Sequence, residues 1–174
     1  MLGCASSNEA AAAVLNPSDL RDVVGHVQEA TVEDVDNAIQ CAINAGPIWQ
    51  ATPPAERAAI LERAADLMEG EIQPLMGLLA REAGKTFANA IAEVREAVDF
   101  LRYYAVQARN DFTNDAHRPL GPVVCISPWN FPLAIFSGQV AAALAAGNPV
   151  LAKPAEQTPL VAAQAVRILL LSLI

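Results

Sequence analysis

The chain has 174 residues, of which 53% are hydrophobic and 17% are charged. This length suits one domain or part of a larger one, and the composition is that of a globular chain rather than a disordered or fibrous one. A formal net charge of -8 and a pI near 4.6 repel phosphate backbones and anionic lipid surfaces, and no cluster of Lys or Arg offsets that field. We therefore expect neither nucleic-acid nor membrane binding by this segment.

The amino-terminal residues 1–13 are small and alanine-rich without a recognisable period, which predicts a disordered tail ahead of a domain over residues 14–174. Turn-forming residues at 16–19 precede an alternating segment at 22–27. That pattern predicts a short strand after a tight turn.

Four helices are expected next, because capping residues punctuate apolar spacings of three and four. Thr31, with Asp34 three residues later, is close to a capping box and opens the first helix. Thr52 can cap the second helix, with Pro53 in a position that needs no backbone donor. Gly70 is expected to close this helix.

The third and fourth helices are expected over residues 71–83, where Gly84 ends the helix, and over residues 86–111. The apolar faces expected to be buried are Val32, Val35, Ile39, Ala42 and Ile43 in the first helix; Ile60, Leu61, Ala64, Leu67 and Met68 in the second; Leu75, Leu78 and Leu79 in the third; and Phe87, Ile91, Val94, Val98, Leu101 and Ala105 in the fourth.

Charged side chains on the fourth helix are interpreted as a solvated face with local ion pairs rather than as catalytic acids. These residues are Glu93, Arg95, Glu96, Asp99 and Arg102.

From Pro119 onward the pattern changes to strand, helix, strand and helix, over about residues 120–126, 132–146, 149–153 and from Pro159. This order predicts a βαβ unit with two parallel strands and helices on the faces of the sheet. Ligands of such sheets bind beyond the carboxyl ends of the strands.

Two polar segments follow those carboxyl ends. Asn130 is flanked by restrictive prolines, which suits a fixed amide donor, although a turn-forming asparagine is the alternative. Lys153 and Glu156 can serve as donor and acceptor for ribose hydroxyls, or form a surface ion pair. The usual glycine-rich dinucleotide fingerprint is absent, so a cofactor here must be held differently.

The segments at residues 128–132 and 147–159, which read PWNFP and GNPVLAKPAEQTP, closely resemble motifs of the aldehyde dehydrogenase superfamily. Residues 14–170 look like the L-glutamate 5-semialdehyde (1-pyrroline-5-carboxylate) dehydrogenase domain of the proline utilization A enzymes, on the strength of the segments at 81–86 and 118–127. The resemblance implies an α/β fold with a helical amino-terminal part followed by a Rossmann-like βαβ unit, which is an incomplete aldehyde dehydrogenase fold.

The same resemblance implies NAD as the cofactor and a small aldehyde as the substrate of a homo-oligomeric parent enzyme. Asn130 would supply the side-chain donor of an oxyanion hole. Lys153 and Glu156 would contact the adenosine ribose, where Glu156 repels a 2'-phosphate and so favours NAD over NADP. Cofactor contacts are also implied for Ile126, Ser127, Pro128, Trp129 and Ala155.

The family's nucleophilic cysteine and general-base glutamate correspond to positions beyond residue 174. The chain has three cysteines, Cys4, Cys41 and Cys125, at spacings unlike a metal site or a disulfide framework, which favours a reducing, cytoplasmic setting. After about Leu170 the sequence departs from the family pattern. We therefore expect an isolated chain that is inactive and of marginal stability, with an unpaired sheet edge.

Two other functions remain open from the sequence. The chain could be a non-catalytic interaction module that pairs through its exposed sheet edge. It could also belong to an aldehyde dehydrogenase of different specificity, because the substrate-selecting loops lie mostly beyond this segment.

Overall fold

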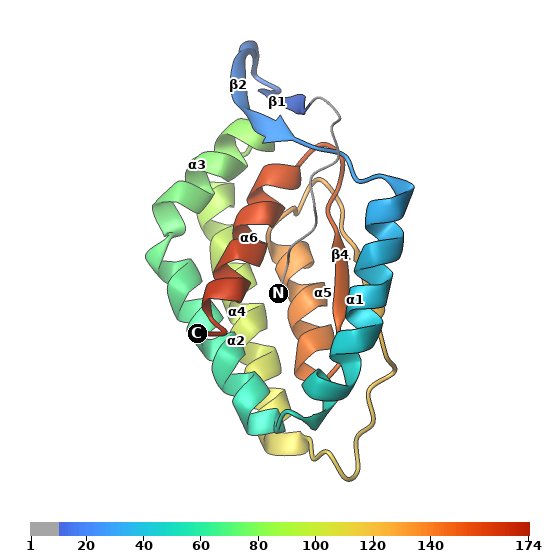
Figure 1. Ribbon diagram of the computed structural model, residues 1–174. Coiled ribbons are helices and arrows are strands. Elements are labelled where there is room, and N and C mark those ends of the chain that lie inside the picture. Colours follow the sequence, from blue (N-terminus) through green and yellow to red (C-terminus); the bar gives the residue numbers. More distant parts are fainter. Residues whose placement is uncertain (1–10) are drawn as a thin grey trace.

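A computed structural model describes residues 11–174 (Figure 1). The elements in chain order are β1 (Ala12–Asn16), β2 (Asp19–Val27), α1 (Val32–Ala51), α2 (Pro54–Gly70), α3 (Ile72–Glu82), α4 (Phe87–Asp111), β3 (Val123–Ile126), α5 (Ala134–Ala145), β4 (Val150–Lys153) and α6 (Pro159–Leu171). In this part of the chain, no helix is both long enough and apolar enough to cross a membrane.

Helices α2 to α6 form one packed body with a two-stranded parallel sheet at its side (Figure 1). α2 and α4 pack along each other, α5 packs against α4, and α6 lies against α2 and α3. A single apolar core runs through these helices and reaches the inner face of β3 and β4. This arrangement confirms the expected helical part followed by a βαβ unit.

An antiparallel hairpin of β1 and β2 stands at one end of the molecule, against α3 and α6 (Figure 1). The expected strand at 22–27 is confirmed but begins earlier, at Asp19, and the expected tail is too long, because Ala12 and Ala13 belong to β1. Alanine gives no alternating pattern, so only the pairing with Val27 and His26 reveals that strand. Residues 1–10, including Cys4, lie outside the described part.

An ion pair fastens this hairpin to α3. Arg81 Nη2 lies 2.5 Å from Asp22 Oδ1, and Arg81 Nε donates to Asp22 Oδ2 at 3.0 Å. These bonds from Arg81, and a further one from Asn16, lower the pKa of Asp22 from 3.8 to about 2. Folding therefore favours the ionised carboxyl, so the stabilisation is complete above pH 3.8 and is lost as the pH falls toward 2.

We expect Asp22→Asn to destabilise the chain at neutral pH, and the difference from the unsubstituted chain to shrink as the pH falls from 3.8 to 2. Urea unfolding at a series of pH values measures that difference. Asp99→Asn, at an exposed acid of α4, is the control. A difference that stays constant across this pH range would contradict the role given to the Asp22 carboxylate.

The first long helix, α1, begins as expected but is not buried as expected. The capping box is present, because the Thr31 hydroxyl accepts from Asp34 N and Asp34 Oδ2 accepts from Thr31 N. Of its apolar stripe, only Ala42 is buried. α1 lies beside β4 and apart from the bundle of α2, α3 and α4 (Figure 1), so most of its apolar face has no neighbour within residues 11–174.

The boundary between α1 and α2 also differs from expectation. Thr52 is the residue that ends α1, and its hydroxyl donates to Ile48 O at 3.1 Å instead of capping α2. Pro53 is therefore the N-cap of α2 and Pro54 its first residue. A proline in the first turn leaves no amide without a partner, so this start is stable without a side-chain cap.

The buried faces of α2, α3 and α4 agree largely with expectation. Gly84 ends the turn after α3 with a φ of 64°, and the Thr86 side chain accepts from Asn89 N at the start of α4. Exposure is higher than expected at Leu67 on α2, and at Phe87 and Ile91 in the first turns of α4. The buried residues of the expected faces are Leu61, Ala64, Met68, Leu75, Leu79, Val94, Val98, Leu101 and Ala105.

Candidate functional site

The two polar motifs meet at the carboxyl edge of the sheet. β3 and β4 pair in parallel with Ile126 opposite Lys153, and Ser127 N donates to Lys153 O at 3.1 Å. The expectation that the fold brings the two strand ends together is therefore confirmed. Side chains that leave these ends face the same region beyond the sheet.

The loop after β3 presents aromatic and amide side chains to solvent. Trp129 and Asn130 are exposed, and Asn130 makes no side-chain hydrogen bond within residues 11–174. Ser127 is buried, and its hydroxyl lies 3.3 Å from Gln139 Oε1 on α5. Of the candidate contacts in this loop, Ser127 can thus reach a ligand only with its backbone, whereas the side chains of Ile126 and Trp129 are accessible.

The loop after β4 carries an exposed pair of opposite charges. Lys153 Nζ lies 3.9 Å from Glu156 Oε1, and more than half of each side chain is exposed. Ala155 between them is buried and holds the turn through Thr158 N, which donates to Ala155 O at 3.1 Å. Because this donor and acceptor are adjacent and exposed, they can bind the two hydroxyls of a diol, or they can pair with each other.

A buried carboxylate, Glu93, supports the first loop. The expectation of a solvated face on α4 is wrong at this residue, and it is confirmed at the exposed Arg95, Glu96 and Asp99. Glu93 is 1% exposed. Its Oε1 accepts from Leu133 N at 2.8 Å and from Ala134 N at 3.2 Å, where α5 begins. Its Oε2 pairs with Lys85 Nζ at 2.5 Å, and that ammonium also lies 4.4 Å from the ring centroid of Phe131.

A second buried glutamate supports the other loop in the same way. Glu82, at the end of α3, accepts from Leu160 N at 2.6 Å and from Val161 N at 2.8 Å in the first turn of α6. Burial raises the pKa of Glu82, and the two backbone hydrogen bonds oppose that rise. Thr158, the N-cap residue, makes no side-chain cap, so the carboxylate from α3 takes that place.

Arginines from α2 bind the opposite ends of the same two helices. Arg57 is buried and donates to Ala145 O at the end of α5, and desolvation lowers its pKa. Arg63 donates to Ser172 O, just after α6. Carboxylates at the amino ends and guanidinium groups at the carboxyl ends match the helix dipoles, although α5 carries no charged residue of its own.

A signal for these buried charges was present in the sequence but was missed. Glu93 follows Ala90 by three residues and precedes Ala97 by four, and both alanines are buried. Glu82 follows Leu79 by three in the same manner. A charged residue in phase with an apolar stripe predicts burial with a partner, since unpaired buried charges are costly.

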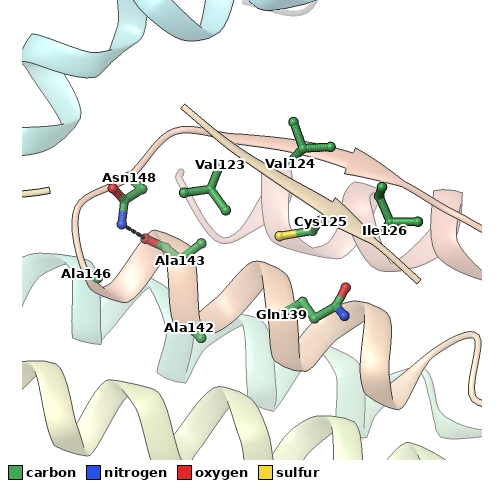
Figure 2. Close-up of a pocket in the computed structure, with 9 residues that line it drawn as sticks. All are labelled: Val123, Val124, Cys125, Ile126, Gln139, Ala142, Ala143, Ala146 and Asn148. Carbon is green, nitrogen blue, oxygen red and sulfur yellow. Dashed lines mark hydrogen bonds between the residues drawn. The ribbon is translucent and has the colours of Figure 1, made fainter. Parts of the chain in front are cut away.

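The described cysteines are not placed as nucleophiles. Cys125 lies between β3 and α5 in a groove of about 460 Å³, and burial raises the pKa of its thiol (Figure 2). Asn148 closes one end of this groove, since its Nδ2 donates to Ala143 O and its Oδ1 accepts from Leu120 N. Cys41 is exposed on α1, remote in sequence from both motifs.

Comparison with known proteins identifies the class to which this arrangement belongs. Residues 4–171 match the pattern of the aldehyde dehydrogenase family. The chain therefore belongs to the aldehyde dehydrogenase family.

Within this family, the chain is similar to enzymes named PutA and 1-pyrroline-5-carboxylate dehydrogenase. The chain is 72% identical over 157 residues to the bifunctional protein PutA of Escherichia coli strain K12, covering 90% of this chain and 12% of that protein. It is 40% identical over 173 residues to 1-pyrroline-5-carboxylate dehydrogenase 2 of Bacillus subtilis strain 168, covering 92% of this chain and 34% of that protein. The chain thus spans a minor part of the length of these relatives.

Solved structures give the same result. A 1-pyrroline-5-carboxylate dehydrogenase from Thermus with bound NAD is similar with a TM-score of 0.90 and 34% identity, over 95% of this chain and 34% of that one. Proline utilization A from Bdellovibrio bacteriovorus gives a TM-score of 0.91 and 34% identity, over 97% of this chain and 19% of that one. The fold expected from the motifs is therefore confirmed.

Proposed function

We propose that the chain is the amino-terminal part of an NAD-dependent aldehyde dehydrogenase that oxidises L-glutamate 5-semialdehyde, the open form of 1-pyrroline-5-carboxylate, to glutamate. The observation that carries this proposal is the meeting of the Asn130 loop and the Lys153–Glu156 loop at one sheet edge. Residues 14–174 form a partial cofactor-binding domain in this proposal. The substrate assignment is supported by the relatives, which include a 1-pyrroline-5-carboxylate dehydrogenase. The whole enzyme in this proposal is cytoplasmic and homo-oligomeric and acts on a small aldehyde.

Asn130 is the residue of this chain that takes part in the chemistry. Its exposed amide can donate to the oxygen that gains negative charge when a thiolate attacks the aldehyde carbon. The prolines on either side of the loop and the Glu93 cap on α5 restrict the backbone that carries the amide. The nucleophilic cysteine and the general base belong, in the family pattern, to positions after residue 174.

The residues present fit the NAD cofactor. Lys153 and Glu156 offer an exposed donor and acceptor to the ribose hydroxyls, and Ile126 and Trp129 offer apolar surface beside them. Pro128 shapes that wall, while Ser127 and Ala155 contribute through their backbone because their side chains are buried. When bound, NAD accepts a hydride from the substrate. Glu156 repels a phosphate at the 2'-position, which favours NAD over NADP.

The cofactor assignment is tested by calorimetric titration with NAD. The titration uses a hybrid enzyme, in which residues 14–170 of this chain replace the matching segment of the Escherichia coli relative. We expect Lys153→Ala and Glu156→Ala each to raise the Kd for NAD on the order of tenfold, the equivalent of one charge-assisted hydrogen bond.

Glu29→Ala, at another exposed acid just after β2, is the matched control and should leave the Kd unchanged. If both Lys153→Ala and Glu156→Ala bind NAD as tightly as the unsubstituted hybrid, the pair is a surface ion pair and the assignment fails.

One observation favours a second candidate, a non-catalytic interaction module. Within residues 11–174 the sheet holds only β3 and β4, so β3 has an unpaired edge, and Val124 and Ile126 are exposed on it. Such an edge can pair with another strand. Sedimentation of the chain distinguishes the two functions, since self-association without NAD binding supports the module and NAD binding by a monomer supports the dehydrogenase.

A further inference from the structure

Two buried glutamates outside the motifs hold the two site loops in corresponding ways. Each comes from the helical bundle, Glu82 from α3 and Glu93 from α4, and each accepts two backbone hydrogen bonds at the start of the helix that follows a site loop. Neither α5 nor α6 has a side-chain cap of its own. The amino ends of both helices are therefore defined by carboxylates that are distant in sequence.

Each glutamate with the two backbone amides that it binds is called a clamp. The first clamp, that of Glu93, holds the end of the loop that carries Asn130. Residues 127–133 link the end of β3, where Ser127 N binds Lys153 O, to the amides of Leu133 and Ala134, which bind Glu93. Lys85 closes the clamp, because its ammonium pairs with Glu93 and also lies over the ring of Phe131, the neighbour of Asn130. Both ends of the short loop and one side chain within it are thus fixed.

The second clamp has the same plan and a different loop. Residues 154–159 link the end of β4 to the amides of Leu160 and Val161, which bind the two oxygens of Glu82. Thr158 in this loop is buried with a hydroxyl that finds no hydrogen-bond partner among the described residues. The turn that carries Glu156 therefore lies between the end of β4 and the two amides that Glu82 binds.

We propose that Glu93 and Glu82 are positioning residues of the dehydrogenase site, Glu93 for Asn130 and Glu82 for the Lys153–Glu156 pair. This inference rests on the proposed function. In this proposal Glu93 affects the chemical step and Glu82 affects the affinity for the cofactor. A merely structural role would change both quantities together. Both carboxylates are buried against backbone amides, so in this proposal they act through the loops and not by contact with substrate or cofactor.

The test uses Glu93→Gln and Glu82→Gln in the hybrid enzyme, which keep the shape of each side chain and remove its charge. An amide nitrogen cannot accept, so Glu82→Gln must lose one of the two backbone bonds. We expect Glu93→Gln to lower kcat about 10- to 100-fold with little change in the Kd for NAD, because displacing a reacting group by about 1 Å costs rate. Glu82→Gln should raise the Kd for NAD on the order of tenfold with little change in kcat at saturating NAD.

Hydrogen exchange measured by mass spectrometry on the same proteins reports on the clamps without requiring activity. Peptides that contain Leu133 and Ala134 should exchange faster in Glu93→Gln, because the amide oxygen left in place of Oε1 is a weaker acceptor and the pair with Lys85 is lost. Those that contain Leu160 and Val161 should exchange faster in Glu82→Gln, because one of the two backbone bonds is lost. Glu96→Gln, on the exposed face of α4, is the matched control and should change neither exchange nor kinetics.

The outcomes are distinguishable from failure of the proposed function. If Asn130→Ala leaves kcat unchanged, the proposed function fails. If Asn130→Ala slows the enzyme but both glutamine variants change kcat and Kd in the same proportion, the glutamates are structural and this inference fails. Local exchange that is unchanged in both variants would also overturn it, because the clamps would then not order the loops.

Discussion

Asn130→Ala should slow turnover of the hybrid enzyme about 10²- to 10³-fold, which is the usual cost of removing one donor from an oxyanion hole. The amide is exposed at the end of β3 and has no protein partner within residues 11–174. Alanine therefore removes no bond that supports the fold. The affinity for NAD should stay nearly unchanged, because the residues proposed to contact the ribose, Lys153 and Glu156, lie at and after the end of β4.

Steady-state kinetics and calorimetric titration check both parts of this expectation. The matched control is Asn44→Ala on α1, where the amide oxygen accepts only from Gln40 on the same exposed helix face. We expect normal kinetics for that variant. A near-normal kcat for Asn130→Ala would show that the asparagine only forms the turn, which is the alternative that the sequence left open.

Leu101→Ala should lower the free energy of unfolding of the chain by about 3 kcal/mol, within the range for buried leucines. Leu101 is 0% exposed and lies in the single core that joins α2, α4 and α5. The substitution removes the isopropyl group and leaves a cavity, which helices held at both ends cannot readily move to fill. Arg57 and Glu93 impose that restraint on α5.

Urea unfolding followed by circular dichroism measures this change. Leu67→Ala is the matched control, since Leu67 belongs to the expected apolar face of α2 but is 40% exposed. We expect a clearly smaller loss there, because less apolar area is buried and a site open to solvent leaves no closed cavity. Equal losses at the two leucines would contradict the packing described for α2 and α4.

The sequence alone determined where the helices and strands of the βαβ unit lie, because local signals are sufficient for this. Prolines and glycines mark the ends, apolar spacing sets the face, and two strands joined by one helix must be parallel. The pairing of the two strand ends that lead into the Asn130 loop and the Lys153–Glu156 loop was also predictable, since parallel strands place their carboxyl ends together. The family was recognisable from those same two segments.

Only the tertiary structure shows which apolar faces are covered and which groups the buried charges bind. The period of α1 identifies its apolar face correctly, but whether another element covers that face depends on the path of the whole chain. The phase of Glu93 with the buried Ala90 and Ala97 indicates burial, but not the partner, because the amides that it binds lie forty residues away on α5. Hydrogen bonds between distant segments leave no local pattern, so the partners of both glutamates became visible only in the folded chain.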